Sequence, residues 1–66
     1  MKNRLKELRL AKGLTQGQIS KDIGIHQRAY SYYENGQRDI PNILLVKFAD
    51  YYEVSIDYIL YRIDSK

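Results

Sequence analysis

Glycine interrupts the first part of the chain at Gly13, Gly24 and Gly36, and each interval has room for a helix of only two or three turns. Glycine readily ends a helix, because it adopts the left-handed backbone conformation that follows the last turn. The rest of the chain also has helical periodicity, and no alternating strand pattern competes with it. The sequence therefore predicts an all-α fold of five short helices.

The chain has little to hold these helices together except apolar packing. It has 66 residues, no cysteine and one histidine, so neither disulfides nor a structural zinc site can supplement the core. A domain this small buries only about 60% of its unfolded-chain surface. Hydrophobic residues make up 44% of the chain and include seven tyrosines, which makes a compact core plausible. We expect one domain over residues 1–66.

The first helix is predicted over residues 1–12. Leu5 and Leu8 lie three residues apart on its inner face, and strong helix formers fill most of the remaining positions. Gly13 fits the position just after its end.

Residues 16–36 are predicted to form two helices joined by a tight turn. Thr15, with Gln18 three residues later, forms a capping-box pattern that starts a helix at about Gln16. Gly24 ends this helix, and the next helix runs from about residue 27 to residue 34. The apolar residues expected to face the core are Ile19, Ile23, Ile25, Tyr30 and Tyr33.

Two more helices follow a polar connector over residues 37–40. Pro41 suits the first residue of the fourth helix, because its missing N–H would have no helical partner there. Glu53 and Val54 separate this helix from the fifth, for which Ser55 is a good cap. The expected inward residues are Leu44, Leu45, Phe48, Ala49 and Tyr52, followed by Ile56, Ile59, Leu60 and Ile63.

The polar face of the third helix is the strongest functional signal. It carries Gln27, Arg28, Ser31 and Tyr32 on a helix that begins just after a glycine turn, as a helix that reads the major groove of DNA requires. The chain has a net charge of +3 and a pI near 9.3, and basic residues outnumber acidic ones up to Gly36 but not after it. This distribution favours a polyanion partner.

Several segments together resemble the phage repressor and Cro type of helix-turn-helix DNA-binding domain. Each segment is weakly specific by itself, but their order and spacing are specific. The matching segments are RLKELR (4–9), GLTQ (13–16), YSYYENGQR (30–38), IP (40–41), KFADYY (47–52) and VSIDYIL (54–60). The resemblance implies a lambda-repressor-like domain that acts as a transcriptional regulator, a repressor in our interpretation.

The resemblance also implies residue roles. Gln27, Arg28 and Tyr32 match positions that contact base edges, and Gln16 matches a phosphate anchor at the start of the second helix. The positions near the sugar-phosphate backbone are matched by Ser31, Asn35, Gln37 and Arg38. Arg9 and Glu34 match a partly buried structural ion pair. Two positions depart from the family pattern: Ser20, where alanine is usual, and His26 at the cap of the third helix.

The residues give little support to an enzyme or a metal site. His26 and Ser31 are about 140° apart on a helix, so they cannot share a proton. Asp50, Glu53 and Asp57 fall where acids commonly cap helices or face solvent. We expect no cofactor, metal or small-molecule ligand. The chain shows neither a signal peptide nor an apolar run of membrane-spanning length, so a cytoplasmic location is expected.

The partners expected from the sequence are double-stranded DNA with a pseudo-palindromic site and a second copy of the chain. The last two helices are more apolar than a free surface needs, and the candidate dimer residues are Ile43, Val46, Tyr51, Tyr58 and Tyr61. Some of these residues could instead complete the core. The alternative function is that of an antitoxin or anti-repressor, which binds a protein and for which DNA binding is secondary.

Overall fold

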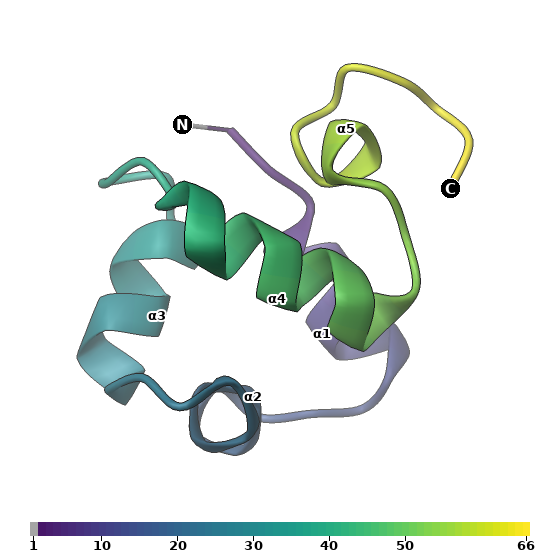
Figure 1. The fold of residues 1–66 in the computed structure, drawn as a ribbon. Coiled ribbons are helices and arrows are strands. Elements are labelled where there is room, and N and C mark those ends of the chain that lie inside the picture. Colours follow the sequence, from purple (N-terminus) through teal and green to yellow (C-terminus); the bar gives the residue numbers. More distant parts are fainter. Residues whose placement is uncertain (1) are drawn as a thin grey trace.

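The computed structural model describes residues 2–66 and is helical, with no strand in that range. The α4 helix lies across the front in Figure 1, with α2 and α3 on one side of it and α5 on the other. The predicted all-α, five-helix fold is confirmed. The helices are α1 (Leu5–Ala11), α2 (Gln16–Ile23), α3 (Gln27–Glu34), α4 (Asn42–Tyr52) and α5 (Ile56–Ile59).

The start of α2 has the predicted capping box. The Thr15 hydroxyl accepts a hydrogen bond from the backbone N–H of Gln18 at 3.1 Å, and the Gln18 side chain accepts one from the backbone N–H of Thr15 at 2.8 Å. Ser55 caps α5 in a similar way, accepting from the N–H of Tyr58 at 3.0 Å. Both helices therefore begin where their capping residues predict.

The turn between α2 and α3 depends on Gly24. Its φ of 91° lies in the left-handed region, which costs a residue with a Cβ atom more than it costs glycine. The backbone N–H groups of Gly24 and Ile25 both donate to the carbonyl oxygen of Ser20, at 2.8 and 2.9 Å. Ser20 is buried, and its hydroxyl donates to the carbonyl oxygen of Gly17 at 3.0 Å, so its polar group is satisfied despite the departure from alanine.

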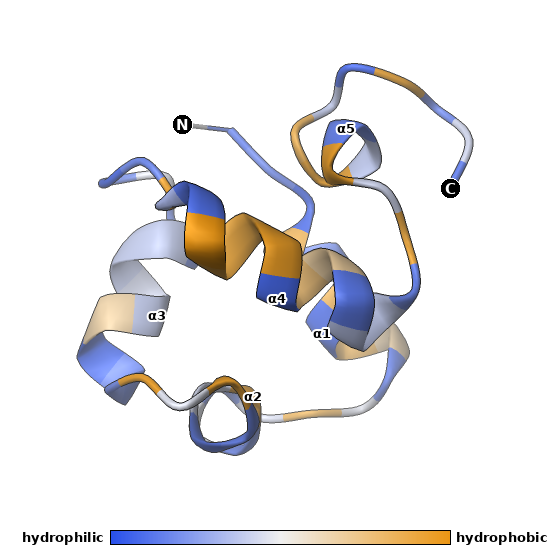
Figure 2. Ribbon diagram, in the orientation of Figure 1, coloured by the Kyte–Doolittle hydropathy of each residue, from blue (hydrophilic) through white to orange (hydrophobic). Residues whose placement is uncertain are grey.

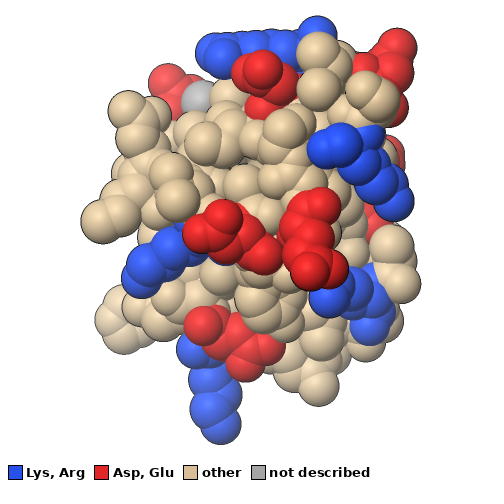
Figure 3. Space-filling model, turned by 45° about the vertical axis from the view of Figure 1, so that its right-hand side comes forward, with Lys and Arg blue, Asp and Glu red and all other residues tan. Residues whose placement is uncertain are grey.

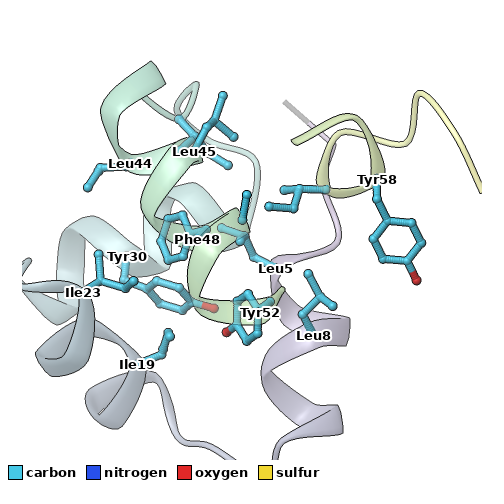
Figure 4. Close-up of a cluster of buried hydrophobic side chains, with 13 residues drawn as sticks. Leu5, Leu8, Ile19, Ile23, Tyr30, Leu44, Leu45, Phe48, Tyr52 and Tyr58 are labelled. Carbon is cyan, nitrogen blue, oxygen red and sulfur yellow. The ribbon is translucent and has the colours of Figure 1, made fainter. Parts of the chain in front are cut away.

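The core is built around α4. Phe48 is fully buried, and its ring packs edge-on against the ring of Tyr30 from α3, with centroids 5.9 Å apart. Figure 4 shows Phe48 surrounded by side chains from the other helices. Because all five helices contribute, the packing fixes α3 relative to the rest of the molecule. The buried apolar residues are Leu5, Leu8, Ile19, Ile23, Tyr30, Ile40, Leu44, Leu45, Phe48, Ala49, Tyr52, Tyr58 and Ile59.

The first helix begins at Leu5, so the prediction of a helix from residue 1 is wrong for residues 2–4; Met1 lies outside the described residues. Tertiary hydrogen bonds hold this segment instead. The N–H of Arg4 donates to the carbonyl oxygen of Ile59 at 2.8 Å, and the Asn3 amide donates to the carbonyl oxygen of Tyr33 at 2.8 Å. These partners are distant in sequence, so the local pattern did not indicate them.

Two details of the last helices also differ from the prediction. Pro41 caps α4 instead of being its first residue: its ψ of 146° is extended, and its carbonyl oxygen accepts from the N–H of Leu44 at 3.0 Å. Ile63 is 41% exposed instead of buried. It lies beyond α5, because that helix ends at Ile59 and the chain then turns at Tyr61, whose φ is 61°.

Arg4, a buried arginine just before α1, contacts α5 and the segment that follows it. The Arg4 guanidinium donates to the carbonyl oxygens of Tyr58 and Ile63 and lies over the rings of Tyr58 and Tyr61, 4.0 and 4.2 Å from their centroids. Arg4 is only 8% exposed. The segment after α5 is therefore held against the N-terminal end of α1.

Candidate nucleic-acid interface

The outer face of α3 carries the three residues expected to contact bases. Gln27 and Arg28 are exposed, and Tyr32, one turn after Arg28, is half-buried. Residues four apart on a helix share a face, so Arg28 and Tyr32 lie on the same side of α3. Within residues 2–66, Arg28 has no hydrogen-bond or ion-pair partner. Figure 2 shows hydrophilic residues at the first turn of α3, whereas α4 is largely hydrophobic.

Gln27 lies against the first turn of α2. An ideal Cβ atom added to Gly17 would be 3.3 Å from Oε1 of Gln27 and 4.0 Å from its Cδ. The absence of a side chain at Gly17 therefore leaves space that Gln27 uses. Gly17 is accordingly part of the candidate site, a role that no sequence pattern indicated.

Tyr32 is contacted by the loop that follows α3. The backbone N–H groups of Gln37 and Arg38 donate to its carbonyl oxygen at 2.9 and 3.4 Å. The Arg38 guanidinium carbon lies 4.4 Å from the centroid of the Tyr32 ring. The structure thus brings together Tyr32 and Arg38, for which the family resemblance implies separate roles in base and backbone contact.

The other expected backbone-contacting residues gather at the end of α3. Asn35 and Gln37 are exposed and Ser31 is half-buried. The Asn35 amide lies 3.4 Å from the Ser31 hydroxyl, to which it donates. Gly36 then turns the chain with a φ of 76°. These side chains lie on the same segment as Arg38, at the far end of α3 from Gln27.

Glu34 joins the first three helices. Its Oε1 accepts from Nε of Arg9 in α1 and from the hydroxyl of Tyr30, each at 2.8 Å. Its Oε2 accepts from Nε2 of Gln16 in α2 at 2.8 Å. Arg9 in turn donates to the carbonyl oxygen of Leu14 at 2.8 Å. The ion pair is well shielded, with side-chain exposures of 11% for Arg9 and 3% for Glu34.

This network determines the ionisation of Glu34. Burial alone would raise its pKa, but the hydrogen bonds from Arg9, Gln16 and Tyr30 together outweigh burial, so the pKa is lowered. Burial, and after it the hydrogen bond to the same carboxylate, raises the pKa of the Tyr30 hydroxyl. Glu34 is therefore held as a carboxylate, and one N–H of Gln16, the expected phosphate anchor, is already engaged with it.

The candidate dimer residues do not form one exposed set. Tyr58 is only 9% exposed and packs against Arg4, so its assignment to a free surface is wrong. Tyr51 is half-buried, and its hydroxyl donates to Asp22 at 2.7 Å. Ile43, Val46 and Tyr61 remain exposed, at 70%, 49% and 42%.

Acidic side chains gather on another part of the surface. Figure 3 brings forward the right-hand side of Figure 1 and shows Asp and Glu residues near the centre, with Lys and Arg around them. Acidic side chains repel phosphate, so this mixed face should attract DNA less than the start of α3, where Arg28 is exposed. None of the helices in residues 2–66 has the length and hydrophobicity needed to span a bilayer.

Comparison with known proteins agrees with this geometry. A family model described as helix-turn-helix matches residues 5–59. The uncharacterised regulator YobD of Bacillus subtilis, described as an HTH-type transcriptional regulator, is 44% identical over 57 residues, which cover 86% of this chain and 51% of that protein. The cryptic phage CTXphi transcriptional repressor RstR of Vibrio cholerae is 43% identical over 58 residues, 86% of this chain and 51% of that protein.

Further relatives are of the same kind. ImmR of B. subtilis, an HTH-type transcriptional regulator, is 39% identical over 57 residues, 86% of this chain and 45% of that protein. The chain thus spans about half the length of the curated relatives it matches. No solved structure gives a significant match. The match over residues 5–59 shows that the chain belongs to the helix-turn-helix family.

Proposed function

We propose that this chain binds double-stranded DNA at specific sequences and acts as a transcriptional regulator, namely a repressor in the cytoplasm. The α3 helix enters the major groove, where Gln27, Arg28 and Tyr32 contact base edges. The observation that carries the proposal is the exposed outer face of α3, on which Arg28 is free of any protein partner within residues 2–66. Glutamine pairs well with adenine and arginine with guanine in the major groove.

Backbone contacts position the helix in this proposal. The first N–H groups of α2 and the remaining N–H of the Gln16 amide contact one phosphate, which the partial positive charge of the helix end favours. Ser31, Asn35, Gln37 and Arg38 contact the backbone at the other end of α3. Regulators named as such among the relatives support a role at promoters. The phage repressor among them supports repression.

The active unit is a homodimer on a pseudo-palindromic site. The Cα extents of one copy are 28 × 23 × 18 Å. Successive major-groove contacts on one side of a duplex are about 34 Å apart, so one small copy cannot place two such contacts. Ile43 and Val46 on α4 and Tyr61 after α5 are exposed apolar residues that a second copy would cover.

The test begins with selection of bound sequences from a random duplex pool, followed by titration of the selected duplex at several salt concentrations. We expect affinity to fall linearly with salt on logarithmic axes, because phosphate contacts release counterions. Gln27→Ala and Arg28→Ala should each reduce preference at one base position, with a loss of about 1–3 kcal/mol of discrimination.

Arg62→Ala is the matched control, because it also removes an exposed arginine but from a site beyond α5, where Arg62 pairs with Asp57. It should leave the selected sequence unchanged. If the protein binds no duplex even at low salt, the DNA-binding proposal is wrong. An antitoxin or anti-repressor role with a protein partner would then be favoured.

A further inference from the structure

The contact between Arg38 and Tyr32 is made by both backbone and side-chain atoms. The Arg38 N–H and the Gln37 N–H donate to the Tyr32 carbonyl oxygen, which brings the loop back over the end of α3. The Arg38 guanidinium then lies over the Tyr32 ring, 4.4 Å from its centroid. A guanidinium over an aromatic face is attracted by the ring and restricts its rotation.

We propose that Arg38 is a positioning residue for sequence readout: its guanidinium fixes the Tyr32 ring in the orientation in which the phenol contacts a base edge. This inference rests on the proposed DNA-binding function and adds a role that phosphate contact alone does not give. A guanidinium that packs on a ring by its planar face leaves its N–H edges available to a phosphate. The Arg38 side chain thus both contacts the DNA backbone and orients the tyrosine that contacts a base pair.

Lysine cannot replace arginine in this role, because an ammonium group carries the charge without the planar surface. A phosphate contact needs mainly the charge, and its loss weakens all sequences equally. A positioning contact needs the plane, and its loss weakens discrimination at the one base pair that Tyr32 contacts. Arg38→Lys separates these two effects.

The experiment measures affinity for the selected duplex and for duplexes with single base changes, using wild type and Arg38→Lys. We expect Arg38→Lys to keep the salt dependence of wild type but to lose about twofold to fivefold discrimination at a single base position, because an ammonium keeps an attraction to the ring but not the planar contact that orients it. In the Tyr32→Leu background, Arg38→Lys should change discrimination no further, because the ring is absent.

Two controls define the result. Arg62→Lys makes the same change outside the site and should leave discrimination intact; Arg28→Lys should alter a different base position. If Arg38→Lys lowers affinity for every duplex by the same factor, or acts equally with and without the Tyr32 ring, the positioning role is wrong although DNA binding stands. If wild type has no sequence preference, the proposed function fails and this inference fails with it.

An NMR measurement on the free protein gives a readout that does not involve DNA. A guanidinium stacked on a ring has side-chain proton signals shifted upfield by the ring current. We expect this shift at Arg38 in wild type and its loss in Tyr32→Leu. Identical Arg38 signals in the two proteins would show that the stack is absent in solution and would overturn the inference.

Discussion

At the scale of single residues, two buried tyrosine hydroxyls have opposite roles. The Tyr30 hydroxyl donates to Glu34, whereas the buried Tyr52 hydroxyl makes no well-formed hydrogen bond among residues 2–66, although the neighbouring Tyr30 hydroxyl acts to lower its pKa slightly. Figure 4 shows the hydroxyl ends of Tyr30 and Tyr52 pointing toward each other. Burial, with smaller contributions from neighbouring groups, raises the pKa of Tyr52 to about 12. Removing a buried hydroxyl without a partner should stabilise a protein, and removing one with a partner should destabilise it.

We therefore predict that Tyr52→Phe raises the free energy of unfolding by about 1 kcal/mol and that the matched Tyr30→Phe lowers it by about 1–2 kcal/mol. Urea denaturation at pH 7 measures both. The raised pKa of Tyr52 also means that wild type loses stability as pH rises above the ordinary tyrosine value of 10.0. Tyr52→Phe should lose less stability between pH 10 and 12. A destabilised Tyr52→Phe protein would show that the hydroxyl has a partner in solution.

Glu34 gives the second prediction at this scale. Its lowered pKa means that the unfolded chain binds a proton more readily than the folded one, so its contribution to stability is present above the ordinary value of 4.5 and is lost as pH falls below that value. Glu34→Gln breaks a shielded ion pair and should cost about 3 kcal/mol at pH 7. It should also remove part of the acid dependence of the unfolding free energy.

The control for Glu34→Gln is Arg62→Gln. The Arg62 pair with Asp57 is exposed, with side-chain exposures of 66% and 53%, so its loss should cost less than about 1 kcal/mol. Both variants are compared by urea denaturation from pH 3 to pH 7. Equal slopes of stability against pH in wild type and Glu34→Gln would contradict the assignment.

At the scale of helices, the sequence predicted best those helix ends that are determined by local hydrogen bonds. Thr15 and Gln18 formed the capping box at the predicted residue, and α3 has the predicted bounds, because caps depend on neighbours a few residues away. Arg4 is the opposite case: it bonds to Tyr58, 54 residues further on, and no local pattern marks that contact. The start of α1 was missed for this reason, whereas the exposure of Ile63 was missed because α5 ends at Ile59 and the chain turns at Tyr61.

The candidate site shows the same division. The spacing on α3 predicted one polar face with Gln27, Arg28 and Tyr32, and the family resemblance assigned base contact to these residues, which stays a prediction. It did not show that Gly17 lies under Gln27 or that Arg38 lies over Tyr32. Those contacts depend on the angle between α2 and α3 and on the path of the loop after α3, which the core fixes.

The contact between α2 and α3 gives a prediction for Gly17→Ala. Alanine should raise the free energy of unfolding by at most about 1 kcal/mol, since it favours the helix. Its Cβ, 3.3 Å from Oε1 of Gln27, should push that side chain aside and reduce discrimination at the base position that Gln27 contacts. Thermal unfolding and the single-base duplex series measure the two effects.

The double variant is the control for Gly17→Ala. With Gln27→Ala already present, Gly17→Ala should not change DNA discrimination further, because the displaced side chain is absent. A Gly17→Ala protein with the full wild-type profile would show that Gln27 reaches DNA without using the space beside Gly17.

At the scale of the whole molecule, the size of one copy relative to DNA leads to the dimer prediction. Val46→Glu places a charge on the exposed apolar surface of α4 and should shift the protein toward the monomer in sedimentation equilibrium. It should weaken binding to a duplex with two half-sites at least tenfold while leaving binding to a single half-site nearly unchanged.

Leu10→Glu is the matched control for Val46→Glu. Leu10 is also an exposed apolar residue, at 56%, but it lies on α1. The Leu10 variant should retain the dimer and the two-site affinity. If Val46→Glu behaves as wild type in both measurements, the dimer does not use this part of α4.

The Arg4 contact has a consequence for proteolysis. Trimming the residues after Leu60 would remove the carbonyl of Ile63 and the ring of Tyr61, and would uncover a cation that the intact chain keeps sheltered. The backbone bond from Arg4 to Ile59 would then be opened to water. Loss of the residues after Leu60 would in this way destabilise the start of α1, so cleavage far from α3 would weaken the core on which α3 packs.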